Sequence, residues 1–141
     1  MAEVAALIGF GFPLIKIGLK SKIPIEEWRA VEHRDRKPED FEGLNVGVKC
    51  GSALPGGGYL CIVDIDPRNG GLMGWKILCE DYDIPEEPTL SVQTGSMGLH
   101  IYFRTEKPIA KCKLAVGVDF QGEGSYCVGP GSLHECGGYY L

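Results

Sequence analysis

The chain has 141 residues, a length that suits one domain with its own core and leaves little room for a second. Hydrophobic residues make up 44% and charged residues 23%, as in ordinary globular proteins, and the formal net charge of -5 excludes a generally basic nucleic-acid-binding surface. Any polynucleotide would therefore be held by a local patch or through metal ions.

The six cysteines form no Cys-x-x-Cys pair and no zinc-binding spacing. We therefore expect most of them to be buried thiols, with disulfides or a zinc site as the alternatives. No secretory signal is recognised, and the apolar stretch at residues 4–19 is too short and too interrupted to span a membrane. These features predict a cytoplasmic protein without a membrane partner.

Short elements and turns are predicted for the first part of the chain, because glycine and proline recur throughout it. Pro13 suggests that the first strand lies at a sheet edge or starts at this residue, since proline cannot donate a ladder hydrogen bond. The expected elements are a strand at 12–19, helical turns at 26–30 and 38–41, a strand at 45–48 and a glycine-rich loop at 51–58.

The central predicted strand is the apolar run at residues 59–66, which Pro67 ends. Side chains alternate along a strand, so Asp64 and Asp66 lie on the same face, with Cα atoms roughly 7 Å apart. A hard divalent cation such as Mg²⁺ or Mn²⁺ would neutralise this pair. A solvated strand end followed by a turn is the alternative interpretation.

After this strand, apolar residues at helical spacing predict a helix over 72–82, ended by Pro85. Two hairpins follow, one of strands 90–94 and 99–103 with its turn at 95–98, the other of strands 116–121 and 125–128 joined through 122–124. We interpret Trp28 and Trp75 as core anchors, with base-stacking platforms as the alternative. We interpret Ser132, His134 and Cys136 as parts of a structural turn, with a nucleotide pocket or a zinc site as the alternatives.

Two further features carry polar chemistry. The turn from Ser96 to His100 brings backbone N–H groups together with a serine and a histidine, which suits a triphosphate; an ordinary hairpin turn is the alternative. Asp119 lies inside an apolar run, where a carboxylate is unfavourable unless it is paired, hydrogen-bonded or bound to a metal. With Asp64 and Asp66 it would supply three carboxylates from two strands, as two-metal phosphoryl transfer requires.

In these residues the sequence resembles the primase-polymerase domains of the archaeo-eukaryotic primase superfamily, especially the bifunctional type of plasmids, viruses and phages. The first family motif, two acids separated by one residue at a strand end, matches Asp64-Ile65-Asp66. The second matches Ser96-Met97-Gly98-Leu99-His100, and the third, an acid after a hydrophobic residue, matches Val118-Asp119. Weaker matches extend the resemblance over nearly the whole chain.

The resemblance implies an α+β fold, the archaeo-eukaryotic primase catalytic core, with an RRM-like sheet and a small additional α/β unit in one domain over residues 1–141. It implies a template-directed nucleotidyltransferase, a DNA primase and DNA polymerase, that replicates DNA of a mobile element. Its implied partners are nucleoside triphosphates, a single-stranded or primed DNA template and a helicase. The implied site comprises Asp64, Asp66 and Asp119 as catalytic ligands of Mg²⁺ or Mn²⁺, and Ser96, Gly98 and His100 as nucleotide-binding residues.

Two positions depart from the family pattern. Met97 replaces a glycine common in the second motif, and Gln121 stands where an arginine often follows the third acid. The second departure weakens an expected phosphate contact. Two alternatives therefore stay beside the polymerase: a non-catalytic nucleotide- or template-binding replication module, and a metal-dependent phosphohydrolase.

Overall fold

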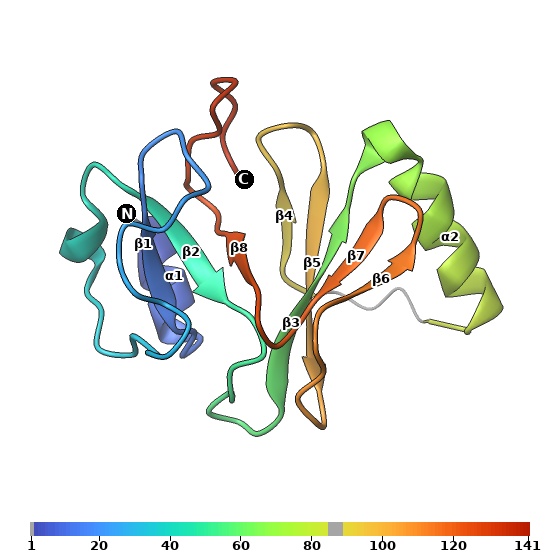
Figure 1. Cartoon of the computed structure of the whole chain (residues 1–141), viewed down its shortest axis with the longest axis horizontal. Helices are drawn as coiled ribbons and strands as arrows, with labels where there is room; N and C mark the ends of the chain where they lie inside the picture. Colours follow the sequence, from blue (N-terminus) through green and yellow to red (C-terminus); the bar gives the residue numbers. More distant parts are fainter. Residues whose placement is uncertain (1, 85–88) are drawn as a thin grey trace.

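Two antiparallel sheets and two α-helices make up the part of the chain described in the computed structural model, residues 2–84 and 89–141 (Figure 1). The predicted α+β class is confirmed. In chain order the elements are α1 (Ala2–Gly9), β1 (Leu14–Ile17), a 3-10 helix (Pro38–Phe41), β2 (Asn45–Lys49), β3 (Tyr59–Ile65), a second 3-10 helix (Pro67–Asn69), α2 (Gly71–Asp81), β4 (Ser91–Gln93), β5 (Leu99–Thr105), β6 (Cys112–Ala115), β7 (Val118–Gln121) and β8 (Tyr126–Val128).

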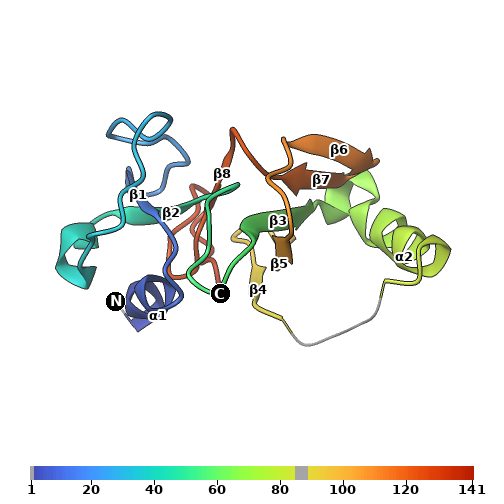
Figure 2. The same ribbon diagram turned by 90° about the horizontal axis from the view of Figure 1, so that it is seen from below.

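The smaller sheet has the strand order β1-β2-β8 and the larger one the order β4-β5-β3-β7-β6. The prediction that the first strand lies at a sheet edge is therefore confirmed. Strand β3 occupies the centre of the larger sheet, and its residues from Leu60 to Val63 are all buried. Figure 2 shows α1 beside the smaller sheet at one end of the molecule and α2 beside β6 and β7 at the other.

The core has two parts because β3 is covered on both faces. Leu60 and Ile62 pack into the main cluster between the two sheets, and both are at most 2% exposed. Val63 and Ile65 point to the opposite face, where Trp75 of α2 packs against them. Truncating a core side chain such as Ile62 to alanine would cost about 2–5 kcal/mol of folding free energy.

The helical turn predicted at residues 26–30 is wrong. Instead, the Glu27 carboxylate accepts hydrogen bonds from the backbone amides of Arg29, at 2.7 Å, and Ala30, at 3.3 Å. This local side-chain acceptor competes with the carbonyl that a helix would provide. The helical turn predicted at 38–41 is confirmed as a 3-10 helix.

The hairpin predicted between residues 116–121 and 125–128 is also wrong. Strand β7 pairs with β3 and β6, whereas β8 pairs with β2 in the other sheet. The connection at 122–124 is a crossover from one sheet to the other. It is held by a hydrogen bond of 2.8 Å from the Glu123 amide to the Ile109 carbonyl. A Cβ at Gly122 would lie 2.0 Å from that carbonyl oxygen, so close packing requires glycine at this position.

The remaining elements largely agree with the predictions. The predicted central strand and helix appear as β3 and α2, and the hairpin at 90–103 as β4 and β5, whereas Pro85 lies outside the described residues. Both tryptophans pack against the core clusters. Helix α1 and strand β6 were not predicted.

All six cysteines are free thiols, and Cys50, Cys61 and Cys127 are buried. The expectation that most are buried therefore holds for half of them. Burial, reinforced by nearby Cys50, raises the pKa of the Cys61 thiol to about 12, so this sulfur stays protonated. Within residues 2–84 and 89–141, neither helix has the length and apolar character needed to cross a membrane.

Candidate active site

A cavity of about 270 Å³ opens where the two sheets and the C-terminal segment meet. All six site residues predicted from the sequence line this cavity: Asp64, Asp66, Ser96, Gly98, His100 and Asp119. They come from β3, its C-terminal end, the β4–β5 turn, β5 and β7. The structure therefore brings the three motifs together, although they are far apart in the sequence.

Strand register explains the convergence. Asp64 on β3 lies directly opposite Asp119 on β7 and, on its other side, directly opposite His100 on β5. Directly opposed residues in an antiparallel pair share a face, with Cβ atoms about 4.5–5.5 Å apart. The three side chains therefore form one row across three adjacent strands. Asp66 directly follows β3, two residues after Asp64, and lines the same cavity.

Asp66 also organises the chain immediately after β3. Its carboxylate accepts hydrogen bonds from the Arg68 amide, at 3.0 Å, and from the Asn69 side-chain amide, at 2.6 Å. These bonds cap the short 3-10 helix that begins at Pro67. Asp66 is thus held in a defined position, but two of its acceptor sites are already used by its own chain.

Each carboxylate of the site has a basic neighbour. Lys113 Nζ lies 3.2 Å from Asp119 Oδ1, and Arg68 Nε lies 3.6 Å from Asp66 Oδ1. His100 Nε2 lies 3.4 Å from Asp64 Oδ1. The local negative charge is therefore partly balanced by side chains of the protein itself.

These contacts of the three carboxylates bear on metal binding. Among the described residues, no three His, Cys, Asp or Glu side chains converge closely enough to hold a metal ion as they stand. The donor type and the shared sheet face of Asp64, Asp66 and Asp119 nevertheless fit a hard divalent cation. A bound ion would require their carboxylates to turn away from Lys113 and Arg68.

The β4–β5 turn is closed by Thr94. The Thr94 hydroxyl accepts the Gly98 amide at 2.8 Å, and the Thr94 carbonyl accepts the Met97 amide at 3.0 Å. The Gly98 N–H is therefore used within the turn and does not face a ligand. In the part of the chain that the structure describes, the Ser96 amide has no hydrogen-bond partner, so Ser96 is the turn residue with a free donor beside the cavity.

His100 is buried, with its side chain 7% exposed. Its Nε2 faces Asp64, while its Nδ1 has no hydrogen-bond partner among the described residues. A buried ring nitrogen without a hydrogen-bond partner lowers the stability of the fold. The site therefore contains a polar atom whose hydrogen bond the protein itself does not supply. This is the kind of group that a bound ligand or an ordered water would satisfy.

Tyr140 also lines the cavity, and no pattern in the sequence predicts this position for it. Tyr140 is 3% exposed, and its ring centroid lies 6.3 Å from that of His100 and 6.1 Å from that of His134. Burial, with a further contribution from the Asp64 carboxylate, raises the pKa of Tyr140 to about 12. Tyr139 beside it is 58% exposed, and nothing in the Tyr-Tyr pair indicates which ring turns inward.

The C-terminal segment that carries Tyr140 is fixed by backbone bonds. Leu141 and Gln93 exchange hydrogen bonds of 2.9 and 3.2 Å, which adds a short stretch to the edge of β4. The Ser132 hydroxyl accepts the Val46 amide at 3.0 Å, and His134 Nδ1 accepts the Cys136 amide at 3.0 Å. These contacts agree with the interpretation of this turn as structural.

Comparison with models of protein families gives a match that covers nearly the whole chain. The model of the family described as bifunctional DNA primase/polymerase, N-terminal, matches residues 5–141. A search of curated proteins finds no significant match.

Proposed function

Since this chain belongs to the bifunctional DNA primase/polymerase family, we propose that it adds nucleotides to a strand paired with a DNA template by metal-dependent phosphoryl transfer. Membership confirms the resemblance drawn from the motifs and makes the chain a nucleotidyltransferase of the DNA primase/polymerase type in general. The observation that carries the finer proposal is the register that sets Asp64 opposite Asp119 on one sheet face.

In this proposal Asp64, Asp66 and Asp119 hold Mg²⁺ or Mn²⁺, because three carboxylates on one face supply the oxygen ligands that these ions prefer. Bound divalent ions would stabilise the developing charge on the attacking 3′-hydroxyl oxygen and on the leaving pyrophosphate. The carboxylates would hold these ions in position, and the closed β4–β5 turn would set the position of the phosphates.

The triphosphate would lie between the acidic row and the β4–β5 turn. Ser96 offers a free amide and a hydroxyl there, the His100 side chain lines the same cavity, and Gly98 keeps the turn narrow. Lys22 and Arg68 line the same cavity and supply positive charge. These residues support a site for a nucleoside triphosphate, although Gln121 offers no charge where relatives often have arginine.

A template-dependent extension assay tests the proposal. The protein would be given a labelled primer on a DNA template, with dNTPs or NTPs and with Mn²⁺, Mg²⁺ or EDTA. We expect extension with a divalent ion and none with EDTA, and no extension from Asp64→Ala or Asp119→Asn. Extension by either variant at the rate of the unmodified protein would refute the assignment of these acids.

The alternative is a non-catalytic nucleotide- or template-binding replication module. It is favoured by the pairing of each carboxylate with a basic side chain and by the amide of Gln121 in the cavity. Metal-dependent triphosphate binding without extension on any primed template would select this alternative. The proposal also includes replication of a mobile element and a helicase partner. Both of these parts rest on the family alone.

A further inference from the structure

A basic segment lies beside the candidate active site of this otherwise acidic chain. Residues 16–37 contain seven Lys or Arg and four Asp or Glu, a formal charge of +3, whereas the whole chain has a net charge of -5. Such a local reversal of charge is what an acidic protein needs in order to bind a polyanion. Part of this segment, residues 18–31, forms an extended loop after β1, which we call the basic loop.

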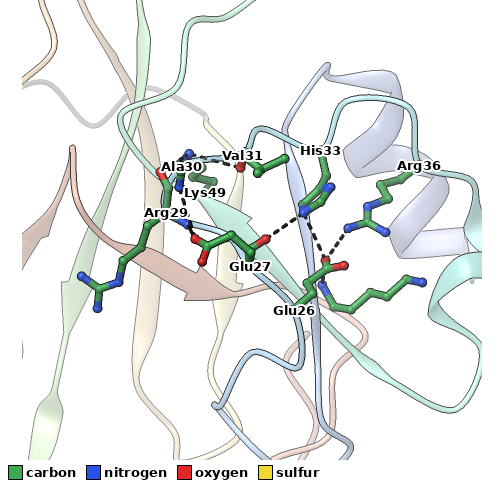
Figure 3. A network of polar contacts seen from close by, with 9 residues as sticks. Glu26, Glu27, Arg29, Ala30, Val31, His33, Arg36 and Lys49 are labelled. Atoms are coloured by element: carbon green, nitrogen blue, oxygen red, sulfur yellow. Dashed lines mark hydrogen bonds and ion pairs between the residues drawn. The ribbon is translucent and has the colours of Figure 1, made fainter.

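The base of the basic loop is fixed by a network of polar contacts, which Figure 3 shows. Glu26 accepts a hydrogen bond from Arg36 and lies 3.8 Å from the His33 ring. Lys49 Nζ donates to the carbonyls of Arg29, at 3.0 Å, and Val31, at 3.3 Å. The loop is therefore held in one arrangement before any ligand arrives.

Three cations of the basic loop are not used in this network. Among the residues that the structure describes, Lys20, Lys22 and Arg29 have no carboxylate within ion-pair distance, and all three are exposed. In Figure 3 the guanidinium group of Arg29 points away from the other polar side chains. It lies over the ring of Trp28, 5.0 Å from the centroid, and so presents a flat cationic surface.

Apolar side chains alternate with these cations on the same loop. Leu19 is 54% exposed, Ile23 is 72% exposed and Ile25 is 58% exposed. Isolated exposed apolar residues are common, but three within seven positions, interleaved with free cations, form a mixed surface. Cations that follow a phosphate backbone and flat or apolar groups that contact bases are the two elements of single-strand recognition.

The basic loop is continuous with the active-site cavity. The Tyr126 hydroxyl donates to the Lys22 carbonyl, and both residues line the cavity that contains Asp64. The Trp28 ring packs edge-on against Tyr126, with centroids 4.7 Å apart. A strand lying on the loop would therefore lead directly to the row of carboxylates.

We propose that the basic loop is a contact surface for single-stranded nucleic acid, which Lys20, Lys22 and Arg29 bind through its phosphates. Ile23 and Ile25 contact the bases of the same strand. This inference deepens the proposed polymerase function, since it names the surface that guides a template or primer strand into the site.

Fluorescence anisotropy with a labelled single-stranded DNA oligonucleotide tests this surface, with EDTA present and no nucleotide, so that catalysis plays no part. The variant Lys20→Gln/Lys22→Gln/Arg29→Gln removes the three cations. Each phosphate contact on a single strand contributes about 0.7 to the slope of log K against log salt, so this slope should fall by about 2. The affinity in low salt should fall by about tenfold or more.

A matched control removes three exposed lysines that line none of the described cavities, in the variant Lys76→Gln/Lys107→Gln/Lys111→Gln. It has the same net charge as the loop variant and should keep the salt slope of the unmodified protein. Ile23→Ser should weaken binding and leave the slope unchanged, because no phosphate contact is lost. Circular dichroism and thermal melting confirm that each variant is folded.

Equal loss of affinity in the loop variant and the control would overturn the inference, as would an unmodified protein that binds no single-stranded DNA. Failure of the proposed function gives a different pattern. In that case, single-strand binding depends on the loop, while no primer is extended under any metal condition.

Discussion

Lys113 Nζ lies 3.2 Å from Oδ1 of Asp119, the residue directly opposite it on the neighbouring strand β7. Lys113 thus forms an ion pair with a carboxylate that, in the proposed function, binds a divalent ion. Because a tethered ammonium group and a metal ion compete for the same oxygens, the lysine should weaken metal binding in the protein without nucleotide. Both side chains are well exposed, so the competition is modest.

Lys113→Met should therefore raise the affinity for Mn²⁺ by about twofold to fivefold, the factor that corresponds to an exposed ion pair. Electron paramagnetic resonance of free Mn²⁺ measures this directly. Lys111→Met removes the same charge two residues away without removing a carboxylate partner of the site, and should leave the affinity near that of the unmodified protein. Equal affinities in all three proteins would contradict competition at Asp119.

Asp64 and Asp119 face each other directly on adjacent strands, and like charges at opposed positions destabilise a strand pair. In the absence of metal, Asp64→Asn should therefore raise Tm by up to about 4 °C while it abolishes primer extension. Calorimetry in EDTA measures the first effect. Asp35→Asn, in an exposed loop, is the control; a drop of several degrees in Asp64→Asn would instead indicate a structural role.

Several features of the site follow from the sequence alone. Alternation along β3 places Asp64 and Asp66 on one face, and the Thr94-to-His100 stretch has the composition of a hairpin turn. Which strand pairs with β8 does not follow, because the glycines at 122 and 124 suit either a tight turn or a crossover. Backbone contacts between residues distant in sequence decide it, such as the Cys50 amide on the Ser125 carbonyl at 3.0 Å.

Local patterns were also insufficient for the ends of the chain. Helix α1 is apolar at nearly every position, with Glu3 as its charged residue, so the sequence does not show a clear helical period of apolar and polar residues. Tyr140 enters the cavity because Leu141 pairs with Gln93 at the edge of β4. That pairing joins segments almost fifty positions apart, and no local pattern indicates it.

The pH dependence of stability should report the Glu26 network. Burial alone raises the pKa of Glu26, but hydrogen bonds from the Arg36 guanidinium and the Lys16 amide outweigh it and hold the pKa below the ordinary value of 4.5. A carboxyl with a lowered folded-state pKa stabilises the fold above the unfolded-state pKa, and this contribution is lost as pH falls through the folded-state pKa.

Glu26→Gln should thus lower the free energy of unfolding by about 1–2 kcal/mol at pH 7, with the difference shrinking progressively below about pH 4.5. Urea denaturation at a series of pH values measures this. Glu106→Gln, an exposed carboxylate elsewhere, should change stability by less than about 0.5 kcal/mol at any pH. A Glu26→Gln deficit that persists unchanged at pH 3 would show that packing, and not charge, carries the effect.

Two neighbouring residues of the β4–β5 turn should respond to substitution in opposite directions. A Cβ at Gly98 would lie 2.8 Å from the Thr94 hydroxyl oxygen and 2.9 Å from the Ile65 carbonyl oxygen, so Gly98→Ala must displace the turn. Met97 has φ of 70° and is 70% exposed, a backbone conformation in which a residue with a Cβ is strained. Met97→Gly should therefore relieve strain of about 1 kcal/mol. In chemical denaturation Gly98→Ala should lose stability, and Met97→Gly should keep or gain it.

If Ser96 and His100 bind the triphosphate, Gly98→Ala should also raise KM for the nucleotide more than it lowers kcat, since the turn positions the phosphates. Loss of stability in Met97→Gly would contradict backbone strain at this residue. A nucleotide KM unaffected by Gly98→Ala would show that the turn does not position the substrate as proposed.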